Sequence, residues 1–146
     1  MQMTNANTIA INEIRNLIRA NYERMVAFEH ASFNVTEQTL KTYFEAKADE
    51  SEMNISELNE VLSSLSGEKF EVEETAEQNM LGASHLFTGQ KDVNVVLKNI
   101  LFLEKSIMGW YKSGIKNLKG ISRGFSHILN KHSVGLEASH IFVKSC

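Results

Sequence analysis

The stretch DVNVVLKNILFLEKSIMGWYKSGI, from Asp92 to Ile115, decides the fold of this chain. It is the most apolar segment of the sequence, and its apolar residues recur at the spacing of an α-helix. They fall on two adjoining stripes, one with Val96, Ile100, Leu103, Ile107 and Trp110, the other with Leu97, Leu101, Met108, Tyr111 and Ile115. Because so much of its surface is apolar, this helix is predicted to lie at the centre of its domain or under a second layer.

One carboxylate, Glu104, lies inside the second stripe, between Leu101 and Met108. A buried charge without a partner is costly, so a carboxylate in this position needs an opposite charge, a proton or a metal ion. Glu104 is therefore the first candidate for a functional residue.

The length of 146 residues suits a single domain, residues 1–146, with a substantial core. The absence of proline favours long uninterrupted helices, because a proline inside a helix costs about 3 kcal/mol. A net charge of −3, with no concentrated basic stripe, argues against nucleic acid as a partner.

Cysteine usage and hydropathy indicate the compartment. A single cysteine, Cys146, excludes a disulfide within the chain and fits a reducing environment. The N-terminal residues lack the apolar core of a signal peptide, and no segment has the roughly 18 apolar residues that cross a membrane. The sequence therefore predicts a cytoplasmic protein without a membrane partner.

Helical periodicity predicts four helices, at about residues 8–32, 37–65, 93–115 and 121–143. Short turns join the first helix to the second and the third to the fourth, which gives two antiparallel hairpins. Residues 68–91 are too long for a hairpin loop, so they are expected to form a crossover with a short helical piece. The prediction is an all-α four-helix bundle with one long crossover.

Four stretches of the sequence are distinctive: NYERMVAFEH (Asn21–His30), ESEMNISELNEVLSSLSG (Glu50–Gly67), LFTGQKD (Leu86–Asp92) and LFLEKSIMGWY (Leu101–Tyr111). They resemble a bacterial family of unknown function within the ferritin-like superfamily. The resemblance extends over about residues 11–141, which is most of the chain. It implies a ferritin-like bundle with the crossover described above, and it does not imply a known substrate.

The wider superfamily implies a di-metal centre, with one Glu from each of two helices and Glu-x-x-His from each of the others. This chain departs from that pattern. Met53 stands three residues after Glu50 where a histidine would be, and Leu129 stands three residues before His132 where a glutamate would be. In the first helix, the inward position is occupied by Asn21, whose amide is a weak metal ligand.

Glu50, Glu104 and His132 are nevertheless predicted to lie near mid-height, each roughly 14 residues from a turn. Two carboxylates and an imidazole are a ligand set that suits iron or manganese, so one hypothesis is a metal site formed by these three residues. The other is a polar core cluster of Asn21, Glu104 and His132, left from a lost metal centre. In that cluster Glu104 and His132 would be hydrogen-bonded neighbours.

Two functions follow from these alternatives. The favoured one is a non-catalytic structural, stress-related or protein-interaction module with a degenerate metal site and no cofactor. The alternative is an iron- or manganese-binding ferritin-like protein with an oxidoreductase or storage role. The third helix also has more apolar surface than its neighbours in one chain can cover, which predicts a homodimer.

Overall fold

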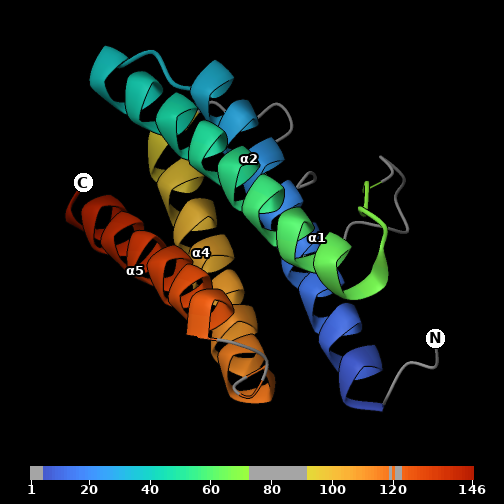
Figure 1. The fold of residues 1–146 in the computed structure, drawn as a ribbon. Helices are drawn as coiled ribbons and strands as arrows, with labels where there is room; N and C mark the ends of the chain where they lie inside the picture. The colour runs from blue at the N-terminus through green and yellow to red at the C-terminus, as the bar shows by residue number, and fades with distance from the viewer. Residues whose placement is uncertain (1–4, 73–91, 119, 121–122) are drawn as a thin grey trace.

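The computed structural model describes residues 5–72, 92–118, 120 and 123–146. These residues form α1 (Asn5–Asn34), α2 (Gln38–Ser66), α4 (Val93–Asn117) and α5 (Arg123–Ser145), with no strand among them (Figure 1). The predicted all-α class is confirmed. None of the described helices combines the length and apolar composition that crossing a membrane requires.

Local signals in the sequence account for the helix ends. The side chain of Glu37 accepts hydrogen bonds from the backbone N–H groups of Thr39 and Leu40 and so caps the start of α2. Gly67 ends α2 in the left-handed conformation, with φ of 80°, which a residue without a Cβ adopts at little cost. Asp92 caps α4 through a 2.9 Å hydrogen bond from the backbone N–H of Asn94.

Most of the predicted crossover, including its short helical piece, lies outside the described residues. Its first residues, 68–72, are described and are held against the bundle at Phe70. The side chain of Asn59 accepts from the backbone N–H of Phe70 at 2.8 Å and donates to its carbonyl at 3.1 Å. The guanidinium of Arg19 lies 4.8 Å from the centre of the Phe70 ring. The chain therefore leaves α2 along a path fixed by α1 and α2.

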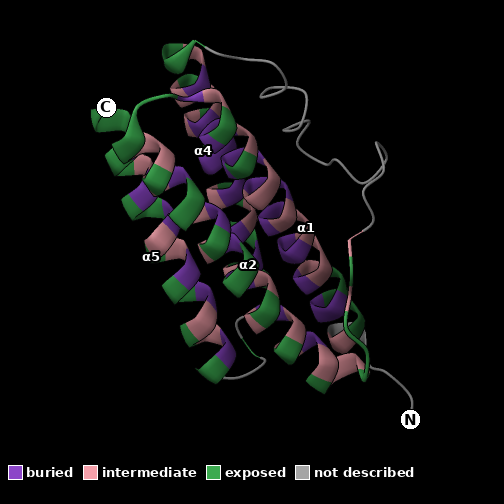
Figure 2. Ribbon diagram, turned by 90° about the horizontal axis from the view of Figure 1, so that it is seen from above, coloured by how far each residue is buried: buried purple, intermediate pink, exposed green. Residues whose placement is uncertain are grey.

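The helices pack as two antiparallel hairpins, α1–α2 and α4–α5, joined by contact between α1 and α4 (Figure 1). The α2 and α5 helices approach each other far less closely than the other three neighbouring pairs. Buried residues line the inward faces of the helices (Figure 2). The bundle is therefore closed tightly on the α1–α4 side and loosely on the α2–α5 side.

The first apolar stripe of α4 faces the core, as its spacing predicts. Val96, Ile100, Leu103 and Ile107 of the first stripe are buried, whereas most of the second stripe is only half-buried. Gly114 allows close packing on α1, because a Cβ at this position would lie 3.2 Å from a methyl carbon of Leu17.

Candidate functional site

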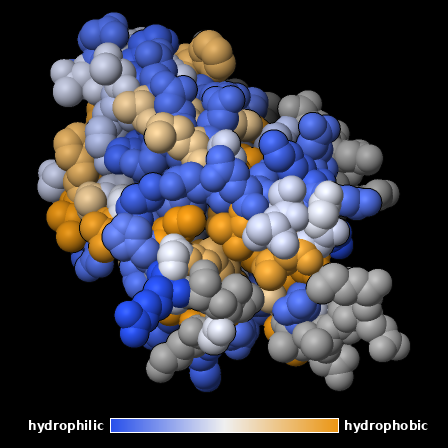
Figure 3. Space-filling view, in the orientation of Figure 1, coloured by the Kyte–Doolittle hydropathy of each residue, from blue (hydrophilic) through white to orange (hydrophobic). Residues whose placement is uncertain are grey.

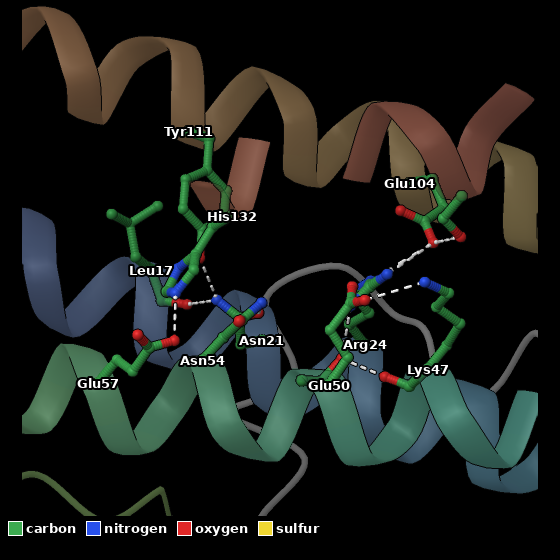
Figure 4. A network of polar contacts seen from close by, with 12 residues as sticks. Leu17, Asn21, Arg24, Lys47, Glu50, Asn54, Glu57, Glu104, Tyr111 and His132 are labelled. Atoms are coloured by element: carbon green, nitrogen blue, oxygen red, sulfur yellow. Dashed lines mark hydrogen bonds and ion pairs between the residues drawn. The ribbon is translucent and has the colours of Figure 1, made fainter. Parts of the chain in front are cut away.

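Two polar networks lie inside the bundle, side by side along the helices (Figure 4). The first, here called the arginine cluster, consists of Arg24, Lys47, Glu50, Ser51, Glu104 and Ser139. The second, here called the tyrosine–histidine chain, consists of Asn21, Asn54, Glu57, Tyr111, Lys131 and His132. Each network takes residues from all four described helices, because helical periodicity brings these positions to the inward faces.

Arg24 is the centre of the arginine cluster. Its Nη1 lies 3.0 Å from Glu50 Oε1 and donates to Ser51 Oγ at 2.9 Å, while its Nη2 lies 3.3 Å from Glu104 Oε1. The side chains of Arg24 and Glu104 are both 0% exposed. The guanidinium also lies 5.0 Å from the centre of the Phe28 ring. A permanent cation thus joins carboxylates from α2 and α4 inside the core.

Among the described residues, the hydrogen bonds to the Glu104 carboxylate all go to one of its two oxygens. Its Oε1 accepts from Arg24 Nε at 3.4 Å, from Arg24 Nη2 at 3.3 Å and from Ser139 Oγ at 2.9 Å. Its Oε2 is buried and has no hydrogen-bond partner among the described residues. Burial raises the pKa of Glu104 above its ordinary value, against the opposing charge of Arg24. The proton of the neutral form therefore belongs on Oε2.

The carboxylate of Glu50 reaches the edge of the cluster, with a side chain 32% exposed. Lys47 Nζ lies 2.9 Å from its Oε2. Burial acts to raise the pKa of Glu50, but the hydrogen bond from Lys47 and the charge of Arg24 outweigh it and hold the pKa below its ordinary value. A Cβ at Gly135 on α5 would lie 3.4 Å from Glu50 Oε1, so this position leaves room for the carboxylate.

The tyrosine–histidine chain begins with two amides. Asn54 Nδ2 donates to Asn21 Oδ1 at 3.1 Å, which links α2 to α1. Asn21 Nδ2 in turn donates to the hydroxyl oxygen of Tyr111 at 2.8 Å and to the carbonyl of Leu17 at 2.9 Å. Because the amide nitrogen can only donate, the hydroxyl hydrogen of Tyr111 is directed away from Asn21.

That hydroxyl meets the imidazole of His132, with 2.7 Å between Tyr111 Oη and His132 Nδ1. On the other side of the ring, His132 Nε2 lies 3.1 Å from Glu57 Oε1, and Lys131 pairs with the second oxygen of Glu57. Burial lowers the pKa of His132, against the opposing effect of Glu57. The neutral ring with its hydrogen on Nε2 satisfies both contacts, since Nδ1 then accepts from the hydroxyl.

The structure brings two of the three predicted metal-site residues together and separates the third. Glu50 and Glu104 meet, but they meet on the guanidinium of Arg24. His132 belongs to the other network, with Tyr111 and Glu57 as its partners. Within the described ranges, no group of three or more His, Cys, Asp or Glu side chains is arranged to hold a metal ion. The donor set therefore does not fit a metal held by Glu50, Glu104 and His132.

The predicted hydrogen bond between Glu104 and His132 is wrong, and so is the single polar cluster that placed Glu104 with Asn21 and His132. Glu104 takes Ser139 as its partner on α5, and His132 takes Tyr111 on α4. The cause is the register of the α4–α5 hairpin. The α4 helix ends at Asn117 and α5 begins at Arg123, both later than predicted, so the turn lies later in the chain.

Arg24 connects the members of the arginine cluster, and Tyr111 connects α1 to α5 in the tyrosine–histidine chain. Neither was a predicted site residue. Arg24 follows Asn21 by three positions and Leu17 by seven, which is the spacing of one helix face. This periodicity was the available signal for Arg24. Tyr111 was predicted as an apolar residue of the second stripe, and its burial is as expected, but its hydroxyl group is a member of the polar network.

The comparisons with known proteins concern the fold. No protein-family model matches the chain, and no curated protein matches its sequence. Among solved structures, a mutant of Mycobacterium smegmatis Dps1 is similar, with a TM-score of 0.78 and 12% sequence identity. The match covers 99% of this chain and 98% of that chain. At this identity the likeness shows the fold alone, and the chain has the fold of a ferritin-like four-helix bundle.

Proposed function

We propose that this chain is a non-catalytic ferritin-like bundle, a structural or protein-interaction module whose former metal position is occupied by an arginine. The observation that supports the proposal is Arg24, a fully buried cation that pairs with both inward carboxylates, Glu50 and Glu104. A guanidinium keeps its charge at every physiological pH and binds carboxylates through several N–H donors. It can therefore neutralise the carboxylates that a divalent ion would otherwise neutralise.

The charges of the arginine cluster support the same proposal. Arg24 and Lys47 supply two positive charges, and Glu50 and Glu104 supply two negative charges when both are ionised. A divalent cation added beside Arg24 would be repelled by it and would leave the site with an excess of positive charge. The buried pairs also join α1 to α2 and to α4. Such pairs can fix the register of helices even where their net contribution to stability is small.

The alternative, an iron or manganese protein, predicts a different result in one measurement. Protein purified without chelator and incubated with Fe²⁺ or Mn²⁺ is expected to contain well under one metal ion per chain after desalting. Its thermal unfolding is expected to be unchanged by a chelator, because no ion stabilises the folded state. Metal content is measured by mass spectrometry of the elements and unfolding by circular dichroism.

A matched pair of variants makes this test specific. Glu50→Gln removes a carboxylate of the arginine cluster, and Glu52→Gln removes an exposed carboxylate two residues away on α2. One metal ion per chain that is lost in Glu50→Gln and retained in Glu52→Gln would contradict the proposal and support the metal-binding alternative. Metal retained equally by both variants would be bound elsewhere on the surface.

We also propose that the chain forms a homodimer. Large apolar side chains are exposed on α5 at Val134, Ile141 and Phe142 and on α4 at Phe102. Figure 3 shows apolar side chains at the surface of one face, among hydrophilic ones. Exposed apolar side chains that gather into a patch often mark an interface.

Light scattering at high micromolar concentration is expected to give twice the chain mass of 16.5 kDa. Ile141→Glu is expected to shift the mass toward that of the monomer, because a charge replaces an exposed apolar contact. Ser56→Glu adds the same charge at an exposed polar position of α2, away from this face of α5, and serves as the control. A monomeric parent protein would exclude the dimer. Equal masses for the two variants would exclude this face as the interface.

A further inference from the structure

The contacts between helices are unequally distributed around the bundle. The α1–α2, α1–α4 and α4–α5 pairs are closely packed, whereas α2 and α5 approach each other far less closely. The boundary between these two helices is called the α2–α5 seam below. It separates the α1–α2 hairpin from the α4–α5 hairpin.

The tyrosine–histidine chain crosses the helix boundaries in order. Asn54 to Asn21 links α2 to α1, Asn21 to Tyr111 links α1 to α4, and Tyr111 to His132 links α4 to α5. The circuit is completed across the α2–α5 seam at Glu57. This carboxylate accepts from His132 Nε2 and pairs with Lys131, both on α5. The first three links survive a separation of α2 from α5, and the Glu57 contacts do not.

The arginine cluster has the same organisation. Arg24 binds Glu50 and Ser51 across the α1–α2 boundary and Glu104 across the α1–α4 boundary. Ser139 binds Glu104 within the α4–α5 hairpin. None of these contacts spans the α2–α5 seam, so the cluster holds the α1–α4 side together whether the seam is open or closed.

Tyr43 on α2 makes further contacts across the seam, through a hydrogen bond between its hydroxyl and Ser139 on α5 and through its ring. The rings of Tyr43 on α2 and Phe142 on α5 are stacked, with 4.0 Å between their centroids. Phe142 is 37% exposed, so the stack lies at the surface and covers little apolar area. Among the described residues, the seam is thus closed by the contacts of Glu57 near its middle, by the close approach of Gly135 to Glu50, and by Tyr43 near the C-terminal end of α5.

We infer that the bundle opens along the α2–α5 seam as two hairpins hinged on the α1–α4 interface, with Glu57 as the latch. Opening breaks the two Glu57 contacts and the contacts of Tyr43 with Ser139 and Phe142, and it leaves the buried Arg24 and Tyr111 contacts intact. It gives solvent or a partner access to the inner faces of α2 and α5, including His132 and Glu50. Local opening of this kind takes less free energy than global unfolding.

Amide hydrogen exchange of the whole native chain, at constant pH with chelator present, tests this inference. Once the seam is open, α5 has lost its packing on α2, so residues 129–136 are expected to exchange by local unfolding from the open state, which leaves residues 17–28 of α1 protected. Glu57→Gln keeps the shape of the side chain and removes the charge that pairs with Lys131. It is expected to increase exchange of 129–136 about tenfold, the usual size for loss of a charged hydrogen bond, without a matching change in 17–28.

Two controls keep the result decisive. Glu60→Gln alters an exposed carboxylate on the same helix and is expected to leave exchange unchanged. Phe142→Ala removes the ring stack and is expected to act in the same direction as Glu57→Gln, whereas Lys144→Ala, at an exposed position of the same helix, is not. The inference is overturned if α5 and α1 exchange together in the parent protein, or if Glu57→Gln and Glu60→Gln have equal effects. The comparison of exchange rates between α5 and α1 uses the parent protein alone, so it does not depend on whether any variant folds.

Discussion

Replacing Arg24 by methionine is expected to lower the free energy of unfolding by about 3–5 kcal/mol, the usual cost of breaking a buried ion pair from one side. Methionine fills most of the volume of the arginine stem, so the loss comes from charge rather than from a cavity. Glu104, 0% exposed, would have only Ser139 as a donor to its Oε1, so it must either stay ionised without a cation or take up a proton. Glu50 would keep Lys47, which limits its share of the loss.

The loss should depend on pH in a defined direction. Burial already raises the pKa of Glu104, and removing Arg24 removes the main effect that opposes this shift. In the variant, the folded state then binds a proton on Glu104 more tightly than the unfolded state does. The variant is therefore expected to be most stable at or below the ordinary pKa of glutamate and to lose stability as the pH rises through the raised value.

Denaturant unfolding at several pH values measures both effects. Arg123→Met, which removes an exposed arginine of α5, is the matched control and is expected to change stability by under about 0.5 kcal/mol. Adding Glu104→Leu to Arg24→Met should recover part of the loss, because an apolar replacement of both partners leaves no buried charge unpaired. A cost for Arg24→Met no larger than for Arg123→Met would show that the cluster does not form.

The fold could be predicted because apolar positions repeat at helical spacing along each helix. This pattern can be read without knowing which other helix packs against it. In α4, the first stripe from Val96 to Ile107 is buried as its spacing predicts, and Gly67 ends α2 as its conformational freedom predicts. Both signals are local. A helix with a broad apolar face must be covered whichever neighbour covers it, so the bundle follows before any contact is known.

The site depends on register, and register is not local. Glu104 and His132 were counted to similar distances from the same turn, but Tyr111, two helical turns after Glu104, lies opposite His132. Shifts of a few residues in where α4 ends and α5 begins are enough to change the partner. Helix ends are the least certain part of a prediction from sequence. The choice of which side chains face each other across a helical hairpin depends on those ends, so it is equally uncertain.

Arg24 was missed for a different physical reason. Its spacing from Asn21 places it on the inward face of α1, but arginine is almost never fully buried unless it is paired. The carboxylates that pair with it, Glu50 on α2 and Glu104 on α4, are far from it in the sequence. The polar pattern of one helix could not reveal partners so distant in the sequence.

Replacing Tyr111 by phenylalanine is expected to lower the free energy of unfolding by about 2–4 kcal/mol, although it removes a single oxygen. The hydroxyl accepts from Asn21 Nδ2 and donates to His132 Nδ1, and its removal leaves both of these contacts unmade. Asn21 is 0% exposed and His132 is 3% exposed, so water in the folded bundle has little access to them. Each buried polar group left without a partner costs about 1–3 kcal/mol.

Denaturant unfolding compares this variant with Tyr43→Phe, which removes the same atom from a ring that is only half-buried and is expected to cost less. Asn21 keeps its bond to the carbonyl of Leu17, so most of the loss should come from His132. Combining Tyr111→Phe with His132→Leu would then cost less than the sum of the two single changes, because the imidazole nitrogen that lost its donor is gone. Additive costs would mean that the hydroxyl and the imidazole do not interact. The tyrosine–histidine chain would then not extend from α4 to α5.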